Sequence, residues 1–285
     1  MRARPRVAIT LGDPRGIGPE IVAKVLADPP PGAEYVVVEG LTTRSDVSAV
    51  EAGRSVGASI ERAAKMAMAG EVDAIVTAPA EKHALHLAGY PYPGHTEWLA
   101  ALAGGVNVAM MLASNRLRVV LITTHIPLTA VPSQVTGERI VATGRITRDA
   151  LKNWWDLAEP RLALCAMNPH AGEQGLFGSE DDDILAPAAR TLGCAGPLPA
   201  DTVFVRAMHG EFDAVLAPYH DVGMTAIKVA SFGKAVNVTL GLPFVRTSPD
   251  HGTAFDIAGK GMADAGSMRE AVKLAVELAT RRNGG

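Results

Sequence analysis

The chain has 285 residues and a formal net charge of -3, and 48% of its residues are hydrophobic but only 5% are aromatic. This length allows one large or two ordinary domains, and the weak charge gives no indication of a nucleic-acid or membrane partner. Two cysteines without CxxC spacing, no apolar run of membrane-spanning length and no signal-peptide pattern predict a cytoplasmic protein.

Short apolar runs alternate with helical patterns along the chain. The expected strands are residues 6–11, 34–40, 73–79, 107–114, 117–125, 161–170, 213–220 and 235–241. Apolar residues at helical spacing occur over 58–69 and 138–158, and the last helix is expected to open with Ser267 and Glu270 as a capping box. This alternation predicts an α/β fold with a mostly parallel sheet.

The first expected strand leads into a glycine-rich stretch, GDPRGIGPE, at residues 12–20. Its glycines do not follow the GxGxxG order of a dinucleotide fingerprint, although Pro19 suits the first position of a helix. Asp13 and Glu20 flank the turn and would repel a phosphate at that helix end. We therefore interpret the stretch as a tight strand-to-helix turn and not as a Rossmann pyrophosphate loop.

Three histidines, His125, His170 and His220, stand at the ends of three expected strands. Ligands of open parallel sheets bind beyond the carboxyl ends of the strands, and three imidazoles there can hold a metal with one position open for substrate. A structural hydrogen-bonding role for each histidine is the alternative. Asp221, beside His220, is a candidate general base or a residue that orients the imidazole.

Further polar residues lie in segments bounded by Gly and Pro or surrounded by apolar residues. His95 and Thr96 follow a Gly-Pro-rich turn, where Thr96 is either a helix N-cap or a ligand-binding group. Lys228, Asn237 and Arg246 lie in an otherwise apolar region. Cations in such a region are often snorkelling or paired, but together they can clamp an anionic substrate.

The segment DHGTAFDIAGKG at residues 250–261 is a candidate cofactor site. His251 and Gly252 form an expected turn, and Thr253 with Asp256 has the spacing of a helix-capping pair. The free amides of a helix N-terminus bind anions, so the turn is a candidate position for a nucleotide.

The motifs GDPRGIGPE, GHTE, TTHIPL, NPHAGE, YHDVG and AVNVTLGLPFVRTSPDHGTAFDIAGKG occur in the order found in the 4-hydroxythreonine-4-phosphate dehydrogenase (PdxA) family of pyridoxal phosphate biosynthesis. The chain resembles this family from about residue 6 to residue 265, and more distantly it resembles the isocitrate and isopropylmalate dehydrogenases. That fold implies two α/β domains with a cleft between them. The resemblance implies an NAD-binding domain over 1–104 plus 232–285, and a domain for metal, substrate and dimer contacts over 105–231.

The resemblance also implies roles for single residues. The implied ligands of a divalent metal (Zn²⁺, Mg²⁺ or Co²⁺), shared between the two subunits of a homodimer, are His125, His170 and His220. The implied substrate-binding residues are His95, Thr96, Lys228, Asn237 and Arg246. The residues expected to bind NAD or NADP are His251, Gly252, Thr253 and Asp256, and the candidate catalytic residues are Asp221 and Lys228.

The implied reaction is metal- and NAD(P)-dependent oxidation of the secondary alcohol of 4-phosphohydroxy-L-threonine, followed by decarboxylation of the β-keto acid. The alternatives are a sister dehydrogenase for 4-phospho-threonate or 4-phospho-erythronate, an aromatic cis-dihydrodiol dehydrogenase, and a metal-dependent lyase or hydrolase. The chain departs from the family pattern at Arg15, Val222 and Ala226, and it is shorter after Gly40. These departures leave the substrate open.

Overall fold

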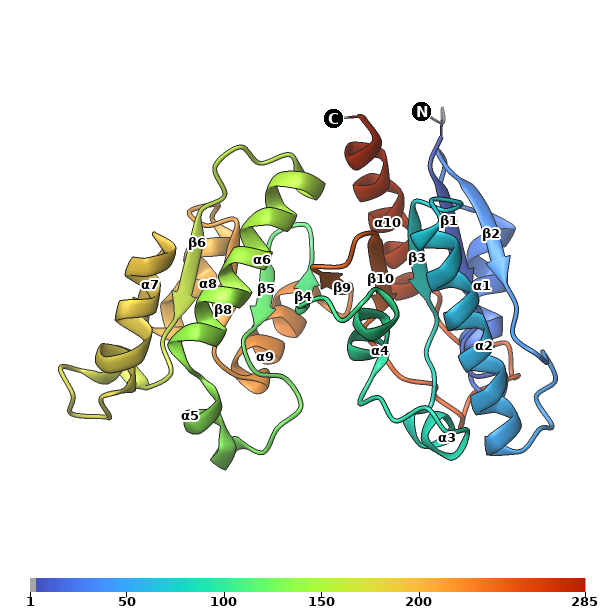
Figure 1. Ribbon diagram of the computed structural model, residues 1–285, viewed down its shortest axis with the longest axis horizontal. Helices are drawn as coiled ribbons and strands as arrows, with labels where there is room; N and C mark the ends of the chain where they lie inside the picture. Colours follow the sequence, from blue (N-terminus) through green and yellow to red (C-terminus); the bar gives the residue numbers. More distant parts are fainter. Residues whose placement is uncertain (1–3, 285) are drawn as a thin grey trace. The chain divides into compact units, whose positions relative to one another are not determined.

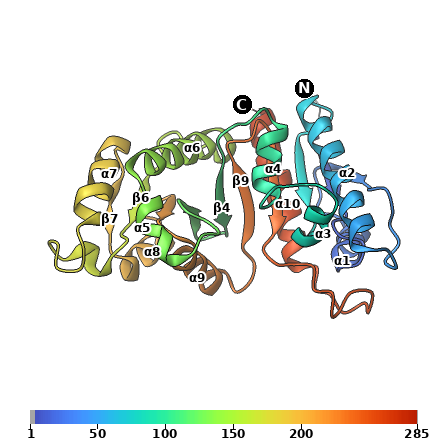
Figure 2. The ribbon, with the colours of Figure 1, turned by 60° about the horizontal axis from the view of Figure 1, so that its bottom comes forward.

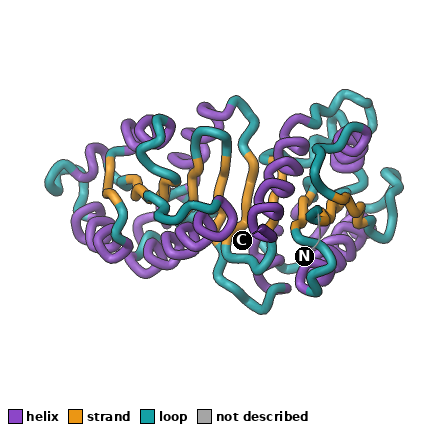
Figure 3. The backbone as a smooth tube through the Cα atoms, turned by 90° about the horizontal axis from the view of Figure 1, so that it is seen from above, coloured by secondary structure: helices purple, strands orange, loops and turns teal. Residues whose placement is uncertain are grey.

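The computed structural model describes residues 4–284. The chain divides into two compact units: unit 1 comprises Met1–Asn107 and Val236–Gly285, and unit 2 comprises Val108–Ala235. Each unit has its own set of strands with helices packed against them (Figure 1). In both units the helices flank the strands on two sides (Figure 3). The prediction of an α/β fold with mostly parallel strands is confirmed.

Unit 1 is built on five strands in the order β2-β1-β3-β10-β9. Their bounds are β1 Arg6–Thr10, β2 Glu34–Val38, β3 Ala74–Thr77, β9 Val236–Leu240 and β10 Val245–Pro249. β1 runs parallel to β2 and β3, β3 runs parallel to β10, and β9 is antiparallel to β10. β3 is buried along its whole length, in keeping with its uninterrupted run of apolar residues.

Five helices of unit 1 cover these strands. They are α1 Gly18–Ala27, α2 Ala49–Met68, α3 Lys82–Leu87, α4 His95–Leu102 and α10 Gly266–Gly284. α2 starts earlier than expected because Ser48 and Glu51 form a capping box, a signature that the sequence carries. At α10 the expected capping box is wrong. Ser267 lies inside the helix and accepts a hydrogen bond from the Asp250 amide (3.4 Å), while Glu270 pairs with Lys273.

Unit 2 is built on five strands in the order β4-β5-β8-β6-β7. Their bounds are β4 Ala109–Ala113, β5 Arg118–Leu121, β6 Leu162–Cys165, β7 Ala195–Leu198 and β8 Ala214–Ala217. β4 is antiparallel to β5, whereas β5, β8, β6 and β7 run parallel to one another. Three parallel strands, β5, β8 and β6, therefore end at the same edge of the sheet.

The helical segments of unit 2 lie on both faces of its strands. They are η1 Leu128–Ala130, α5 Val131–Gln134, α6 Gly137–Trp155, η2 Pro169–Gly172, η3 Asp181–Leu185, α7 Ala186–Leu192, α8 Ala200–Met208 and α9 His220–Ser231. Figure 2 shows α6 on one side of the strands of this unit and α8 and α9 on the other. Over residues 4–284, no helix combines the length and the apolar character that crossing a bilayer requires.

Two strands were not expected from the sequence. β7 has the sequence AGPL and β10 the sequence VRTSP, so both contain residues that are depleted in strands. β10 nevertheless lies fully buried between β3 and β9. β10 carries Arg246, one of the substrate-binding residues expected from the sequence.

Candidate functional site

Arg246 is a buried cation whose neighbours are hydroxyl groups. Its residue is only 3% exposed; Nη1 donates to Thr239 Oγ1 at 3.0 Å and Nη2 donates to Thr77 Oγ1 at 2.6 Å. Its Nε has no hydrogen-bond partner, and no carboxylate of residues 4–284 forms an ion pair with it. Burial lowers the pKa of Arg246 to about 10, against an opposing effect of the Glu97 charge, so the group is a cation at neutral pH. A buried cation with no carboxylate in direct contact is expected to bind an anion.

The strand register explains how these side chains meet. Arg246 on β10 pairs with Ile75 on β3, and Thr77 lies two residues further along the same strand. Side chains two residues apart point to the same face of a sheet, which brings Thr77 to the guanidinium. On β9, Asn237 and Thr239 share a face for the same reason.

Helix α4 adds two more residues beside these strands. The helix begins at His95 after Gly94, which occupies the N-cap position with an extended backbone. Thr96 is therefore not the N-cap. Its buried hydroxyl lies 3.4 Å from Thr239 Oγ1, the hydroxyl that also accepts from Arg246.

Two other buried polar atoms of unit 1 lack hydrogen-bond partners: His95 Nε2, whose ring is affected by the Arg246 charge, and Asn237 Oδ1, on the same strand face as Thr239. Burial, followed by the charges of Arg246 and Lys82, lowers the pKa of His95 to about 3, so this imidazole is neutral at physiological pH. A neutral imidazole offers one N–H donor. We call His95, Thr96, Asn237 and Arg246, with Thr77 and Thr239, the Arg246 cluster.

Sequence reasoning missed the threonines of this region. Thr77 and Thr239 hold the guanidinium, and Thr10 of β1, which pairs in register with Thr77, is buried with an unpartnered hydroxyl. The available signal was a threonine at or near the end of the apolar strands β1, β3 and β9. A strand buried on both faces has no need of such a hydroxyl for packing.

The histidines of unit 2 follow the carboxyl ends of its parallel strands. β5, β6 and β8 end at Leu121, Cys165 and Ala217, so the histidines lie after the strands rather than within them. We call His125, His170 and His220 the histidine edge.

His125 and His220 lie side by side at this edge. Their ring centroids are 5.5 Å apart, and the rings are inclined at 46°. His220 is the first residue of α9, and its Nδ1 lies 2.7 Å from Asp221 Oδ1. This hydrogen bond leaves Nε2 of His220 as the nitrogen that can bind a cation.

His170 lies apart from that pair within one chain. It belongs to η2, with its backbone in the left-handed region (φ 52°) and its ring 6.3 Å from the Phe177 ring. Among residues 4–284 of a single chain, no three His, Cys, Asp or Glu side chains gather as a metal site. The structure thus brings two of the three expected metal ligands together.

The donor chemistry of the histidine edge fits a divalent cation. Imidazole nitrogens suit Zn²⁺ and Co²⁺. A carboxylate that accepts a hydrogen bond from the far nitrogen of a ligating histidine is the usual orienting group, and Asp221 is placed to do this for His220. A divalent cation bound at this edge would find two ligands in His125 and His220 and would need at least one more.

Lys228 lies in unit 2, on the same helix as Asp221. Both are exposed, and their spacing of two helical turns places them on the same face of α9. Val222 and Ala226 instead pack against the hydrophobic core formed by Leu121, Val215 and their neighbours. Those two departures from the family pattern are core contacts.

The glycine-rich turn of unit 1 is held by its own side chains. Asp13 is fully buried and accepts hydrogen bonds from the backbone and side chain of Arg15, which also pairs with Glu81 at 2.7 Å. At Gly12, which has φ +72°, a Cβ would lie 2.2 Å from the Pro79 carbonyl oxygen. The structure agrees with a packed structural turn, because a buried carboxylate stands where a phosphate would bind.

The 251–256 segment contacts this turn but does not begin a helix. The Ile17 amide donates to the Thr253 carbonyl at 2.9 Å. His251, Gly252 and Asp256 are exposed, and a run of turns continues to residue 261. The expected Thr253–Asp256 capping pair is therefore wrong: glycines at 259 and 261, both with φ +72°, interrupt any helix there, and α10 begins only at Gly266.

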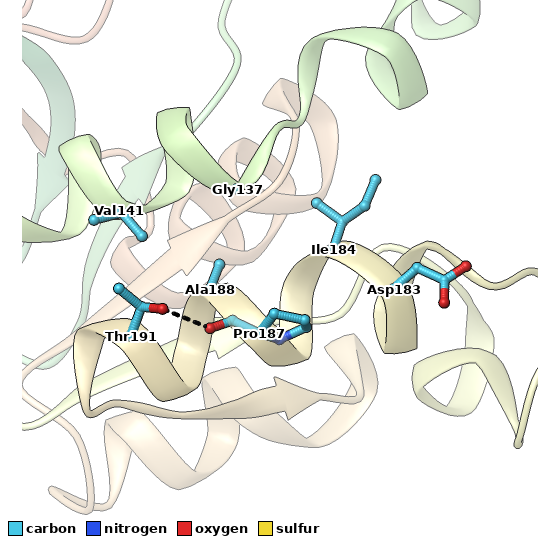
Figure 4. Close-up of a pocket in the computed structure, with 7 residues that line it drawn as sticks. All are labelled: Gly137, Val141, Asp183, Ile184, Pro187, Ala188 and Thr191. Atoms are coloured by element: carbon cyan, nitrogen blue, oxygen red, sulfur yellow. Dashed lines mark hydrogen bonds between the residues drawn. The ribbon is translucent and has the colours of Figure 1, made fainter.

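A shallow cavity of about 280 Å³ lies elsewhere in unit 2, between α6 and the η3–α7 segment (Figure 4). Its lining is mostly apolar and comprises Gly137, Val141, Asp183, Ile184, Pro187, Ala188 and Thr191. Thr191 donates to the Pro187 carbonyl at 2.9 Å, so this hydroxyl is already bonded within α7. The cavity includes no member of the Arg246 cluster or the histidine edge.

Comparisons with known proteins identify the family of this chain. The chain is 42% identical to the 4-hydroxythreonine-4-phosphate dehydrogenase of Geobacter metallireducens, over 99% of this chain and 98% of the relative. It is 40% identical to the D-threonate 4-phosphate dehydrogenase of Salmonella typhimurium, over 96% of this chain and 98% of the relative. The Geobacter alignment spans 332 positions against 285 residues here, so the relative carries residues that this chain lacks.

Two solved structures resemble this chain, one at high and one at low sequence identity. The crystal structure of 4-hydroxythreonine-4-phosphate dehydrogenase from Klebsiella pneumoniae matches with a TM-score of 0.85 and 37% identity, over 96% of this chain and 99% of that one. Isocitrate dehydrogenase from Methylococcus capsulatus matches with a TM-score of 0.57 and 16% identity, which confirms the expected fold alone. The family model of the pyridoxal phosphate biosynthetic protein PdxA matches residues 25–275. This chain belongs to the PdxA family.

Proposed function

We propose that this protein is a metal- and nicotinamide-dependent dehydrogenase that oxidises the secondary alcohol of 4-phosphohydroxy-L-threonine, with loss of the carboxylate as CO₂. The observation that carries the proposal is Arg246, a buried cation bonded to two threonine hydroxyls and left without a counter-ion. A phosphate supplies the missing charge and can accept from the free Nε. His95 contributes an uncharged N–H donor beside it.

Residues of unit 2 have three different roles in the proposed reaction. His125, His170 and His220 hold a divalent cation, which polarises the substrate alcohol, while NAD or NADP supplies the hydride acceptor. Asp221 holds the His220 imidazole through the 2.7 Å contact to Nδ1 and keeps Nε2 directed away from itself. Lys228, on the same face of α9 as Asp221, binds the substrate carboxylate or carries the proton released by the alcohol.

We place the nicotinamide cofactor beside the 251–256 segment of unit 1, with His251, Gly252, Thr253 and Asp256 as its binding residues. The segment is fixed by the bond from Ile17 to Thr253, while His251 and Gly252 remain exposed to a ligand. This assignment makes 1–104 plus 232–285 the cofactor domain and 105–231 the metal domain. Both cysteines are free thiols, which fits a reducing cytoplasm.

We further propose a homodimer whose partner subunit completes the metal site. Within one chain His125 and His220 are adjacent, but no three-ligand group forms among residues 4–284. Large apolar side chains in the loop that carries His170 are exposed, with Leu176 at 72% and Phe177 at 46%. Exposed apolar residues beside an incomplete site favour burial against a second copy.

A second candidate substrate is D-threonate 4-phosphate. The Salmonella typhimurium relative named for it is 40% identical, close to the 42% of the relative named for 4-hydroxythreonine-4-phosphate. Both molecules carry a phosphate and a secondary alcohol, so the Arg246 cluster serves either one. The region that distinguishes them must bind the amino group of one and the hydroxyl group of the other.

The test follows formation of reduced nicotinamide by its absorbance in purified, metal-loaded protein. The substrates offered are 4-phosphohydroxy-L-threonine, 4-phospho-threonate and 4-phospho-erythronate, each beside its dephosphorylated form. We expect turnover of the first, and weak or no turnover without the phosphate. A preference for 4-phospho-threonate or 4-phospho-erythronate would instead identify that sugar acid as the substrate. Equal turnover with and without the phosphate would contradict the role of Arg246.

A further inference from the structure

The loop that carries His170 has an unusual backbone. Six consecutive residues, 170–175, all have positive φ, and four of them are not glycine: His170 (52°), Ala171 (55°), Glu173 (44°) and Gln174 (54°). Left-handed backbone costs free energy at each residue with a Cβ. Such a run persists only where the surroundings fix it, and strain of this kind concentrates at functional sites.

One side chain fixes the entrance to this loop. Asp181 is 0% exposed and belongs to the π-helical turn η3. Its Oδ1 accepts from the Met167 amide at 2.8 Å and its Oδ2 accepts from the Asn168 amide at 2.9 Å. Both oxygens of one buried carboxylate therefore bind the two consecutive amides that lead from β6 into the strained run.

A second contact supports the same point. The Asn168 side-chain amide donates to Glu180 Oε2 at 2.9 Å, so the residue next to Asp181 also holds the loop entrance. Further along, a Cβ at Gly172 would lie 3.0 Å from the Gly178 carbonyl oxygen. The two ends of the segment 167–181 are thus bound to each other around His170.

We propose that Asp181 is the positioning residue for His170: it fixes the loop in its strained form before any cation binds. The inference rests on the proposed role of His170 as a metal ligand. Asp181 itself contacts neither the substrate nor the cation. It acts by placing the imidazole, so that metal binding does not have to order the loop.

The decisive comparison uses Asp181→Asn with Asp182→Asn and Asp183→Asn as matched controls. The controls are exposed neighbours in the same turn and have the same change of charge. In Asp181→Asn one acceptor oxygen becomes an NH₂ group that faces a backbone N–H. In metal-free protein we expect hydrogen exchange of the Met167 and Asn168 amides to rise at least about tenfold, with no change in the controls.

The second readout is Co²⁺ affinity by titration, with the absorption spectrum of bound Co²⁺ as the signature of its ligands. We expect Asp181→Asn to weaken binding about 10- to 100-fold. Adding Ala171→Gly, which removes the cost of one left-handed residue, should recover part of that loss. A role of Asp181 in global stability alone would leave the Co²⁺ affinity of the folded Asp181→Asn protein equal to that of its controls.

The outcomes separate this inference from the proposed function. If His170→Ala binds Co²⁺ as tightly as the unchanged protein, the metal role of His170 is wrong. If His170→Ala weakens binding but Asp181→Asn matches its controls, the positioning role is wrong. If Asp181→Asn does not fold, the variant with Ala171→Gly and Gln174→Gly added should fold, and failure of that variant also overturns the proposal.

Discussion

The Arg246 cluster and the histidine edge differ in how far the fold encloses their polar side chains. The Arg246 cluster is enclosed: strands on both sides of β10 bury the guanidinium, and threonine hydroxyls fix two of its nitrogens. The histidine edge is open: His125 and His170 are exposed, and His220 is half-buried. The fold of one unit therefore positions the side chains of the first site almost completely, whereas the metal site that we propose at the second would need a cation and a further ligand.

The largest effect is expected at the histidine edge. His170→Ala removes a proposed metal ligand, so turnover should fall more than about 1000-fold and Co²⁺ binding should weaken, because an orienting group alone is worth about 10- to 100-fold. Steady-state rates with saturating metal provide the measurement. His83→Ala, which alters an exposed histidine of α3, is the control. Full activity in His170→Ala would remove the histidine edge from the mechanism.

A smaller effect is expected for Arg246→Met, which keeps a long side chain but no charge. KM for the phosphorylated substrate should rise about 100-fold with kcat changed far less, since a charge-assisted clamp contributes mainly to binding. The melting temperature of the free protein should stay the same or rise, because an unpaired buried cation is removed. Arg44→Met at the exposed pair with Asp46 is the control. A large loss of kcat with unchanged KM would contradict the clamp.

Asp221→Asn tests whether this carboxylate orients His220 or accepts the proton. An orienting role predicts a loss of about 10- to 100-fold that excess metal reverses, with the pH–rate profile unchanged. A general base instead predicts loss of the acidic limb of that profile and no recovery with metal. Rates measured across pH at two metal concentrations distinguish the two roles.

The smallest effect concerns the pH dependence of stability in unit 1. The pKa of His95 is about 3 in the folded chain, below its ordinary value of 6.5, so only the unfolded chain gains this proton between those limits. The stability that the neutral His95 contributes is complete above pH 6.5 and is lost as the pH falls toward 3. Over that range the unfolding equilibrium constant rises by at most about tenfold per pH unit. His95→Gln should lack this component. Denaturant unfolding from pH 5 to 7, where few carboxylates titrate, measures the difference, and parallel curves would disprove it.

The sequence by itself determined the α/β class and the positions of most strands, because uninterrupted apolar runs bounded by turn residues are local signals. It also predicted His125, His170 and His220 as candidate ligands, since polar residues at the ends of such runs are conspicuous without any knowledge of the sheet. The sequence did not predict β10, because Arg246 and Pro249 disfavour a strand locally. The Thr253–Asp256 capping pair was wrong for the opposite reason: its local spacing suits a helix, whereas Ala254 within it and Gly259 and Gly261 just beyond it adopt positive φ.

Only the tertiary structure decided which polar residues meet. Register across β3, β10 and β9 places Thr77 and Thr239 around Arg246, although they are 169 and 7 residues away from it in the chain. Asp181 is a second example, because its carboxylate accepts hydrogen bonds from amides 13 and 14 residues earlier in the chain. In the sequence it is simply the first of three consecutive aspartates, and nothing there distinguishes it from its two exposed neighbours. Apolar periodicity reports which face of an element is buried, whereas the partner of a buried polar group depends on strand order and register. Those are fixed only when the whole unit packs.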